Sequence, residues 1–97
     1  MKKSLSEFDI IVADIRNERY RQDKKWGPAA ERNLPLATWQ TVLSEEFGEV
    51  GAAILHGPLN GYHEIRDELI QVAATAIAMI EALENRAPFG LEAKNAG

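Results

Sequence analysis

The fold is decided by the stretch PLATWQTVLSEEFGEVGAAILHGP, residues 35–58, which has the pattern of an amphipathic helix. Apolar side chains recur along it every three or four positions, as on one face of an α-helix. They are Leu36, Trp39, Leu43, Phe47, Val50 and Ile54. Pro35 suits the first turn of a helix, and the pair Gly57-Pro58 ends one. We therefore expect a helix over about 36–55 whose apolar stripe lies in the core.

The flanking residues predict two more helices, over about 5–24 and 62–84. Ser4 and Glu7 form a capping box for the first, and Gly27-Pro28 ends it. The apolar arc of the last helix is wider than one neighbouring helix needs, which indicates burial on two sides. Its members are Ile65, Leu69, Val72, Ala73, Ala76, Ile80 and Leu83, widened by Ile70 and Ile77. The tail, 85–97, shows little pattern and is expected to be loose.

These patterns predict an all-α fold, a helical bundle with three main helices in a single domain over 1–97. Three helices of this size make a thin core. A fourth element, or another subunit, would complete a four-helix bundle and cover the wide apolar face of the last helix. We therefore expect a homo-oligomer, a dimer or a tetramer, with Trp39 and Met79 in the core.

Composition narrows the range of functions. The formal net charge of −4 argues against a nucleic-acid polymer as partner, since such binding depends on phosphate contacts. The chain has no cysteine, which removes disulfides and thiolate metal sites. No run approaches the roughly 18 apolar residues of a membrane span. We expect a soluble cytoplasmic protein that makes no membrane contact.

Three glutamates lie close together on the helix over 36–55. At about 100° per residue, Glu46 falls within the apolar arc, Glu49 at its edge and Glu45 further round. A glutamate that only solubilises a helix would lie opposite the apolar stripe. The position of Glu46 therefore indicates a carboxylate turned toward the interior of the bundle.

A second acidic pair, Glu64 and Asp67, lies one turn apart near the start of the last helix. A tight turn over 57–61 would bring this pair to Glu46 and Glu49. Like charges that close repel, and burial adds a desolvation penalty, so the group needs a cation or must protonate. Mg²⁺ is a hard cation that takes carboxylate oxygens and keeps positions open for water and phosphate. The alternative is a plain helical bundle for association, whose acidic residues are solvated.

The order EE-x-x-E at 45–49, then fourteen residues, then E-x-x-D at 64–67 resembles a known family. It is similar to the MazG-like all-α nucleoside triphosphate pyrophosphohydrolases, whose relatives include dimeric dUTPases and phosphoribosyl-ATP pyrophosphohydrolases. The resemblance covers roughly residues 18–84. The segment RQDKKWG, 21–27, also looks like the one that precedes the first acidic motif in small members.

The resemblance implies a MazG-like helical bundle and a reaction. A nucleoside triphosphate would be cut between its α and β phosphates, giving a monophosphate and pyrophosphate. By position, the residues that match the family's Mg²⁺ ligands are Glu46, Glu49, Glu64 and Asp67, with Mn²⁺ as a substitute ion. Glu45 matches a position that orients or deprotonates the attacking water. Either Glu45 or Glu46 could have that catalytic role.

Four residues near the end of the first helix are candidates for binding substrate. Arg21 and Lys25 are candidates for the triphosphate, although basic residues there also complement the helix C-terminus. Gln22 and Trp26 are candidates for the base, with Trp26 stacking on it. A core or interface role is the alternative for Trp26.

Two further pairs of residues carry weaker expectations. A transition-metal site at His56 and His63 is disfavoured, because histidines flanking a turn are more often incidental. Asn85-Arg86 is a doubtful candidate for a nucleotide contact. A protein that binds nucleotide and metal without turnover is the rival to the enzyme, alongside the plain bundle.

Overall fold

The computed structural model describes residues 4–86 and consists of helices. These are α1 (Glu7–Trp26), the 3₁₀ turn η1 (Ala29–Glu31), α2 (Leu36–His56) and α3 (Tyr62–Glu84). No strand occurs between residues 4 and 86. The all-α prediction is confirmed, and the predicted helix ends lie within two residues of those observed. Most of the tail that was expected to be loose, 87–97, lies outside the described residues.

The capping box of α1 differs from the prediction. Ser6 is the N-cap: its hydroxyl accepts a hydrogen bond from the Asp9 N–H at 3.1 Å. The Asp9 carboxylate accepts in turn from the Ser6 N–H at 3.3 Å. Ser4 and Glu7 were the wrong pair, because Ser6 and Asp9 have the same spacing and make both reciprocal bonds. The helix ends where predicted, since Gly27 has a φ of 88°, a conformation that favours glycine.

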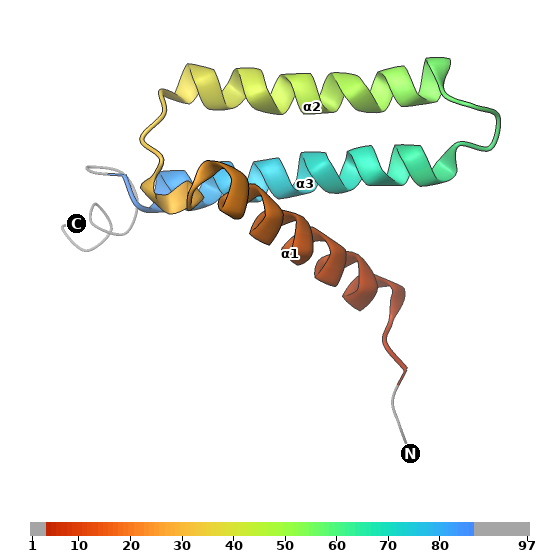
Figure 1. The fold of residues 1–97 in the computed structure, drawn as a ribbon, viewed down its shortest axis with the longest axis horizontal. Coiled ribbons are helices and arrows are strands. Elements are labelled where there is room, and N and C mark those ends of the chain that lie inside the picture. Colours follow the sequence, from red (N-terminus) through yellow and green to blue (C-terminus); the bar gives the residue numbers. More distant parts are fainter. Residues whose placement is uncertain (1–3, 87–97) are drawn as a thin grey trace.

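The hairpin of α2 and α3 is the frame of the molecule. Figure 1 shows these two helices running antiparallel, while α1 packs near the C-terminal part of α3 and diverges from the hairpin toward its own N-terminus. The radius of gyration is 16.2 Å, whereas about 12 Å is expected for a compact chain of this length. A single chain therefore has an open shape.

The buried core is small and lies where η1, α2 and the C-terminal half of α3 meet. Trp39 is 2% exposed and packs in one cluster with Ala29, Ala78 and Ala82. Met79 is partly buried against this cluster. The prediction of Trp39 and Met79 as core residues is confirmed. Small alanines on α3 leave room for the indole of Trp39, so one large side chain fills the junction.

The predicted core stripe of α2 is divided between core and surface. Trp39 and Val50 are buried, but Leu36, Phe47 and Ile54 are 45%, 66% and 60% exposed. The prediction was wrong for these three because α3 is the main neighbour of α2 and covers only the side that carries Trp39 and Val50. The arc predicted for α3 was wrong: none of its members is fully buried, Leu69, Ile77 and Ile80 are exposed, and the buried residues of α3, namely Ala74, Thr75, Ala78 and Ala82, lie outside that arc.

Polar contacts fix α1 and the loop before α2 against α3. Arg19 of α1 is buried and forms ion pairs with Glu81 of α3 and, at 2.9 Å, with Asp23. The Arg86 guanidinium donates a hydrogen bond to the Leu34 carbonyl. The C-terminal end of α1 and the loop are thereby held beside α3. Within residues 4–86, no helix is both long and apolar enough to cross a membrane.

Candidate acidic site and adjoining cavity

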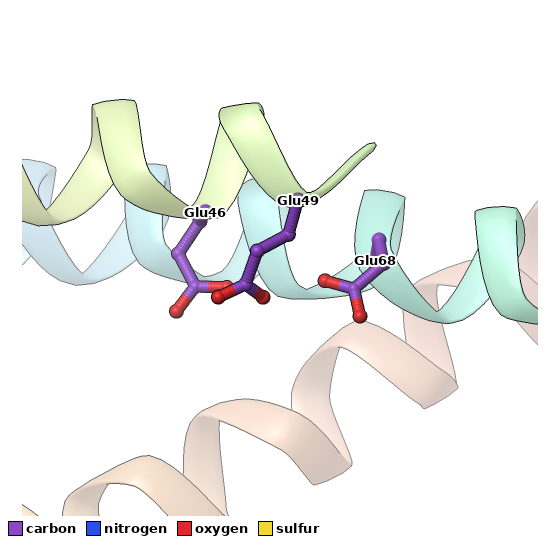
Figure 2. A group of neighbouring side chains, drawn as sticks. All are labelled: Glu46, Glu49 and Glu68. Carbon is purple, nitrogen blue, oxygen red and sulfur yellow. The ribbon is translucent and has the colours of Figure 1, made fainter. Parts of the chain in front are cut away.

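Three carboxylates come together between α2 and α3. Single oxygens of Glu46, Glu49 and Glu68 all lie within 4.8 Å of one another. Figure 2 shows Glu46 and Glu49 descending from α2, and Glu68 reaching toward them from α3. Across residues 4–86 this is the one group of three or more potential metal-ligating side chains. The hairpin thus concentrates negative charge on one side.

The structure brings together only two of the four predicted metal ligands. Glu46 and Glu49 belong to the group, while Glu64 and Asp67 are exposed and lie outside it. Glu64 lies near the end of α2: a Cβ atom added to Gly57 would lie 3.5 Å from its Oε2. Glu68 takes the α3 position in the group and was not predicted.

A signal for Glu68 exists in the sequence but is ambiguous. Relative to Gln71, Asp67 is turned about 40° one way round the helix and Glu68 about 60° the other way. Helical periodicity cannot tell which side faces α2. That depends on how α3 is rotated in the hairpin, and the packing of its alanines around Trp39 sets the rotation.

Burial and mutual repulsion disfavour ionisation in this group. The pKa of Glu46 is raised above its ordinary 4.5, first by burial and then by Glu49, Glu18 and Glu45, while Arg21 opposes the shift. The pKa of Glu68 is raised by burial and then by its contact with Glu49. Without a metal ion, Glu46 and Glu68 therefore bind protons more readily than a glutamate in water does.

The donor set fits a hard divalent cation. Glu68 Oε2 is buried and has no hydrogen-bond partner. A buried carboxylate oxygen in that state is destabilising unless a cation or proton reaches it. Three carboxylates from two helices supply the oxygens that Mg²⁺ or Mn²⁺ prefers, and a bundle interior is a common place for such a set.

Helix α1 adds an ion pair beside the acidic group. The Arg21 Nε donates to Glu18 at 2.9 Å, and a second guanidinium nitrogen bonds the other carboxylate oxygen. This bidentate contact raises the pKa of Arg21 and orients its side chain. Glu18, only 11% exposed in its side chain, was not predicted. Its spacing of three from Arg21 was the available signal.

A cavity of about 500 Å³ adjoins the acidic group. Glu46 belongs to both, so the carboxylates lie at its edge. All four residues predicted to bind substrate line it, namely Arg21, Gln22, Lys25 and Trp26. Residues of α2, of α3 and of the loop before α2 complete the wall. Its size is within the range of small-molecule sites.

The predicted base-binding residues differ in exposure and in hydrogen bonding. Trp26 is 60% exposed, so the alternative of a core tryptophan does not hold in the single chain. The Lys25 ammonium lies 4.9 Å from the centre of the Trp26 ring. Gln22 is more fixed, because its amide oxygen accepts from Arg19 at 3.1 Å and its nitrogen faces Thr75 at 3.4 Å.

The remaining candidates lie away from the cavity wall. Glu45 is exposed and acts on Glu46 only through its charge. His56 and His63 are exposed and join no potential metal-ligating group among residues 4–86. Asn85 donates to the Glu81 carbonyl. With Arg86, it lines a separate cavity of about 300 Å³.

Comparison of the chain with models of protein families, with curated proteins and with solved structures gave no match.

Proposed function

We propose that the protein is a Mg²⁺-dependent nucleotide pyrophosphohydrolase that cuts a (deoxy)nucleoside triphosphate to its monophosphate and pyrophosphate. The observation that carries the proposal is the shared position of Glu46, which belongs both to the three-carboxylate group and to the cavity wall. Across that wall lie Arg21 and Lys25. Acidic ligands for a cation and basic contacts for an anion thus meet at one place.

The charges explain why a metal is needed. A triphosphate would be repelled by three carboxylates whose oxygens lie within 4.8 Å of one another. Glu46, Glu49 and Glu68 would hold the ion. When bound, Mg²⁺ neutralises phosphate oxygens and lowers the pKa of a water molecule. Arg21, oriented by Glu18, and Lys25 contact phosphate oxygens from the α1 side of the cavity.

The reaction needs no covalent intermediate. Water attacks the α-phosphorus, a new P–O bond forms, and the bond to the bridging oxygen of the β-phosphate breaks. The electron pair leaves with pyrophosphate, and a glutamate takes the water proton before passing it to solvent. Glu46 is the stronger candidate for this base, because it lines the cavity. Glu45, the other candidate, lies further out.

Pyrophosphate release from a panel of ribo- and deoxyribonucleoside triphosphates tests the proposal, with Mg²⁺ and with EDTA. We expect release only with the metal, and its loss in Glu46→Gln and Glu68→Gln. Asp67→Asn and Glu64→Gln are matched controls, since both carboxylates are exposed and outside the group. Release that survives in Glu46→Gln and Glu68→Gln would overturn the site.

We further propose that a second copy of the chain covers the apolar surface of the hairpin. Leu36, Phe47 and Ile54 lie on one side of α2, and Phe47 is turned about 100° from Glu46. Leu69 and Ile80 of α3 are 49% and 54% exposed. Pairing two hairpins through these residues would complete a four-helix bundle and leave the carboxylates accessible. Light scattering coupled to gel filtration should give at least twice the monomer mass of 10.8 kDa.

A further inference from the structure

Two residues that line the cavity each carry a buried hydrogen-bond donor without a partner. Trp39 is 2% exposed, and its indole nitrogen makes no hydrogen bond. The Arg32 Nε is likewise buried and unpaired. Both residues line the cavity beside Glu46. Buried donors in native proteins nearly always have a partner. Two unsatisfied donors on residues that line one cavity therefore indicate that a ligand supplies the acceptors.

The two donors belong to one stacked pair. The guanidinium carbon of Arg32 lies 4.7 Å from the centre of the Trp39 ring. Packing around Trp39 fixes the indole, and stacking fixes the guanidinium against it. Both side chains are thus held in place before any ligand arrives, as a site that discriminates between ligands requires.

The neighbouring amide does not offer a free acceptor. The Gln22 oxygen already accepts from Arg19, so its side chain turns its nitrogen toward Thr75. Arg21 and Lys25 add only donors to the wall. Glu46, the acidic member, lies with the carboxylate group where the phosphates are proposed to bind. The lining from α1 and from the loop before α2 is therefore rich in donors, whereas Gln71 of α3 offers both a donor and an acceptor.

We propose that Trp39 and Arg32 read the nucleobase by donating to two adjacent acceptors on its edge. This rests on the proposed function. Guanine presents O6 and N7 side by side, and cytosine presents O2 and N3. Adenine places an amino donor beside its ring nitrogens, and thymine and uracil place an N–H between their carbonyls. The site therefore selects guanine and cytosine nucleotides over adenine and thymine or uracil nucleotides.

Paired substrates test this selection: dGTP against dATP, and dCTP against dTTP, compared by kcat/KM. In the wild type, each ratio should be about tenfold or more, the discrimination expected of buried donors left unpaired by the wrong ligand. Trp39→Phe keeps an aromatic ring but loses the N–H, and should bring both ratios close to one. 7-Deaza-dGTP, which lacks the N7 acceptor, should react like dATP.

Two further variants keep the test sharp. Arg32→Lys retains the positive charge but loses Nε, and should also lower both ratios. It keeps the inference testable if Trp39→Phe fails to fold. Trp26→Phe is the matched control, because it also removes an indole N–H from the lining of the same cavity, but from an exposed side chain. It should alter all four substrates alike and leave the ratios unchanged.

Binding of α,β-methylene triphosphates, which resist cleavage at the proposed bond, separates this inference from the function. Base preference in binding without turnover of the natural substrates would refute the hydrolase and support the base contacts. Turnover without base preference, or with ratios unaffected by Trp39→Phe and Arg32→Lys, would overturn the base contacts and leave the hydrolase. Neither binding nor turnover would overturn both.

Discussion

Replacing Glu68 with glutamine should stabilise the metal-free protein. The substitution removes one of three negative charges whose oxygens lie within 4.8 Å of one another. At that separation two unit charges repel by about 0.9 kcal/mol in water and about 3.5 kcal/mol at an effective dielectric constant of 20. Glu49 is exposed, so the lower value applies to its pair with Glu68. The partly buried Glu46 adds at least as much, so the gain is about 2 kcal/mol.

Thermal unfolding, followed by circular dichroism at 222 nm, measures this gain. For a chain of this size, about 1 kcal/mol corresponds to a rise in Tm of roughly 4 to 8 °C. The measurement is made in EDTA at pH 8, well above the ordinary glutamate pKa of 4.5. Glu64→Gln and Asp67→Asn are matched controls that remove exposed charges outside the group, and should change Tm less.

Added Mg²⁺ should reverse the order of the two Tm values, so that the wild type unfolds at a higher temperature than Glu68→Gln. The wild type gains stability because the ion binds the folded group. Glu68→Gln has lost a ligand and gains much less. A fall in Tm for Glu68→Gln in EDTA would refute the repulsion between these carboxylates. A full Mg²⁺ gain in the same variant would refute its part in holding the ion.

Three other predictions concern pH, phosphate binding and assembly. Because the pKa values of Glu46 and Glu68 are raised in the fold, the folded state binds more protons than the unfolded one. In EDTA, the free energy of unfolding should therefore rise as pH falls from about 7 toward 4.5, the ordinary pKa of glutamate. The stabilisation by Mg²⁺ should shrink over the same range. A lower stability in EDTA as pH falls would contradict the raised pKa values. Arg21→Ala should raise KM for the triphosphate roughly tenfold or more, the effect of losing a hydrogen bond to a charged group; an unchanged KM would remove Arg21 from the phosphate contacts. Phe47→Asp should lower the mass found by light scattering toward that of one chain, because a charge replaces an apolar residue in the proposed contact between copies; an unchanged mass would place the contact elsewhere.

Much of the fold could be predicted from helical periodicity alone. Gly27 and Gly57 ended helices close to the predicted positions, because glycine followed by proline interrupts a helix in any context. The same periodicity placed Glu46 toward the interior, where the structure has it half-buried beside the cavity. These features depend on local sequence.

Features that depend on how helices rotate against one another were not predictable. Periodicity treats Trp39 and Phe47 as equivalent apolar residues, but only Trp39 matches the small alanines of α3. That one fit sets the rotation of the hairpin, buries Trp39 and leaves Phe47 exposed. It also brings Glu68 rather than Asp67 to the acidic group. Trp39 was predicted as core, but its unpaired N–H in a cavity wall is visible only in three dimensions.

The most direct test of the central claim is the ³¹P NMR spectrum of deoxynucleoside triphosphates incubated with the protein and Mg²⁺. We predict resonances of pyrophosphate and of nucleoside monophosphate in equal amounts, absent when EDTA replaces the metal. Orthophosphate with nucleoside diphosphate would show that a different bond is cut. An unchanged spectrum from a folded protein would contradict the proposed enzyme.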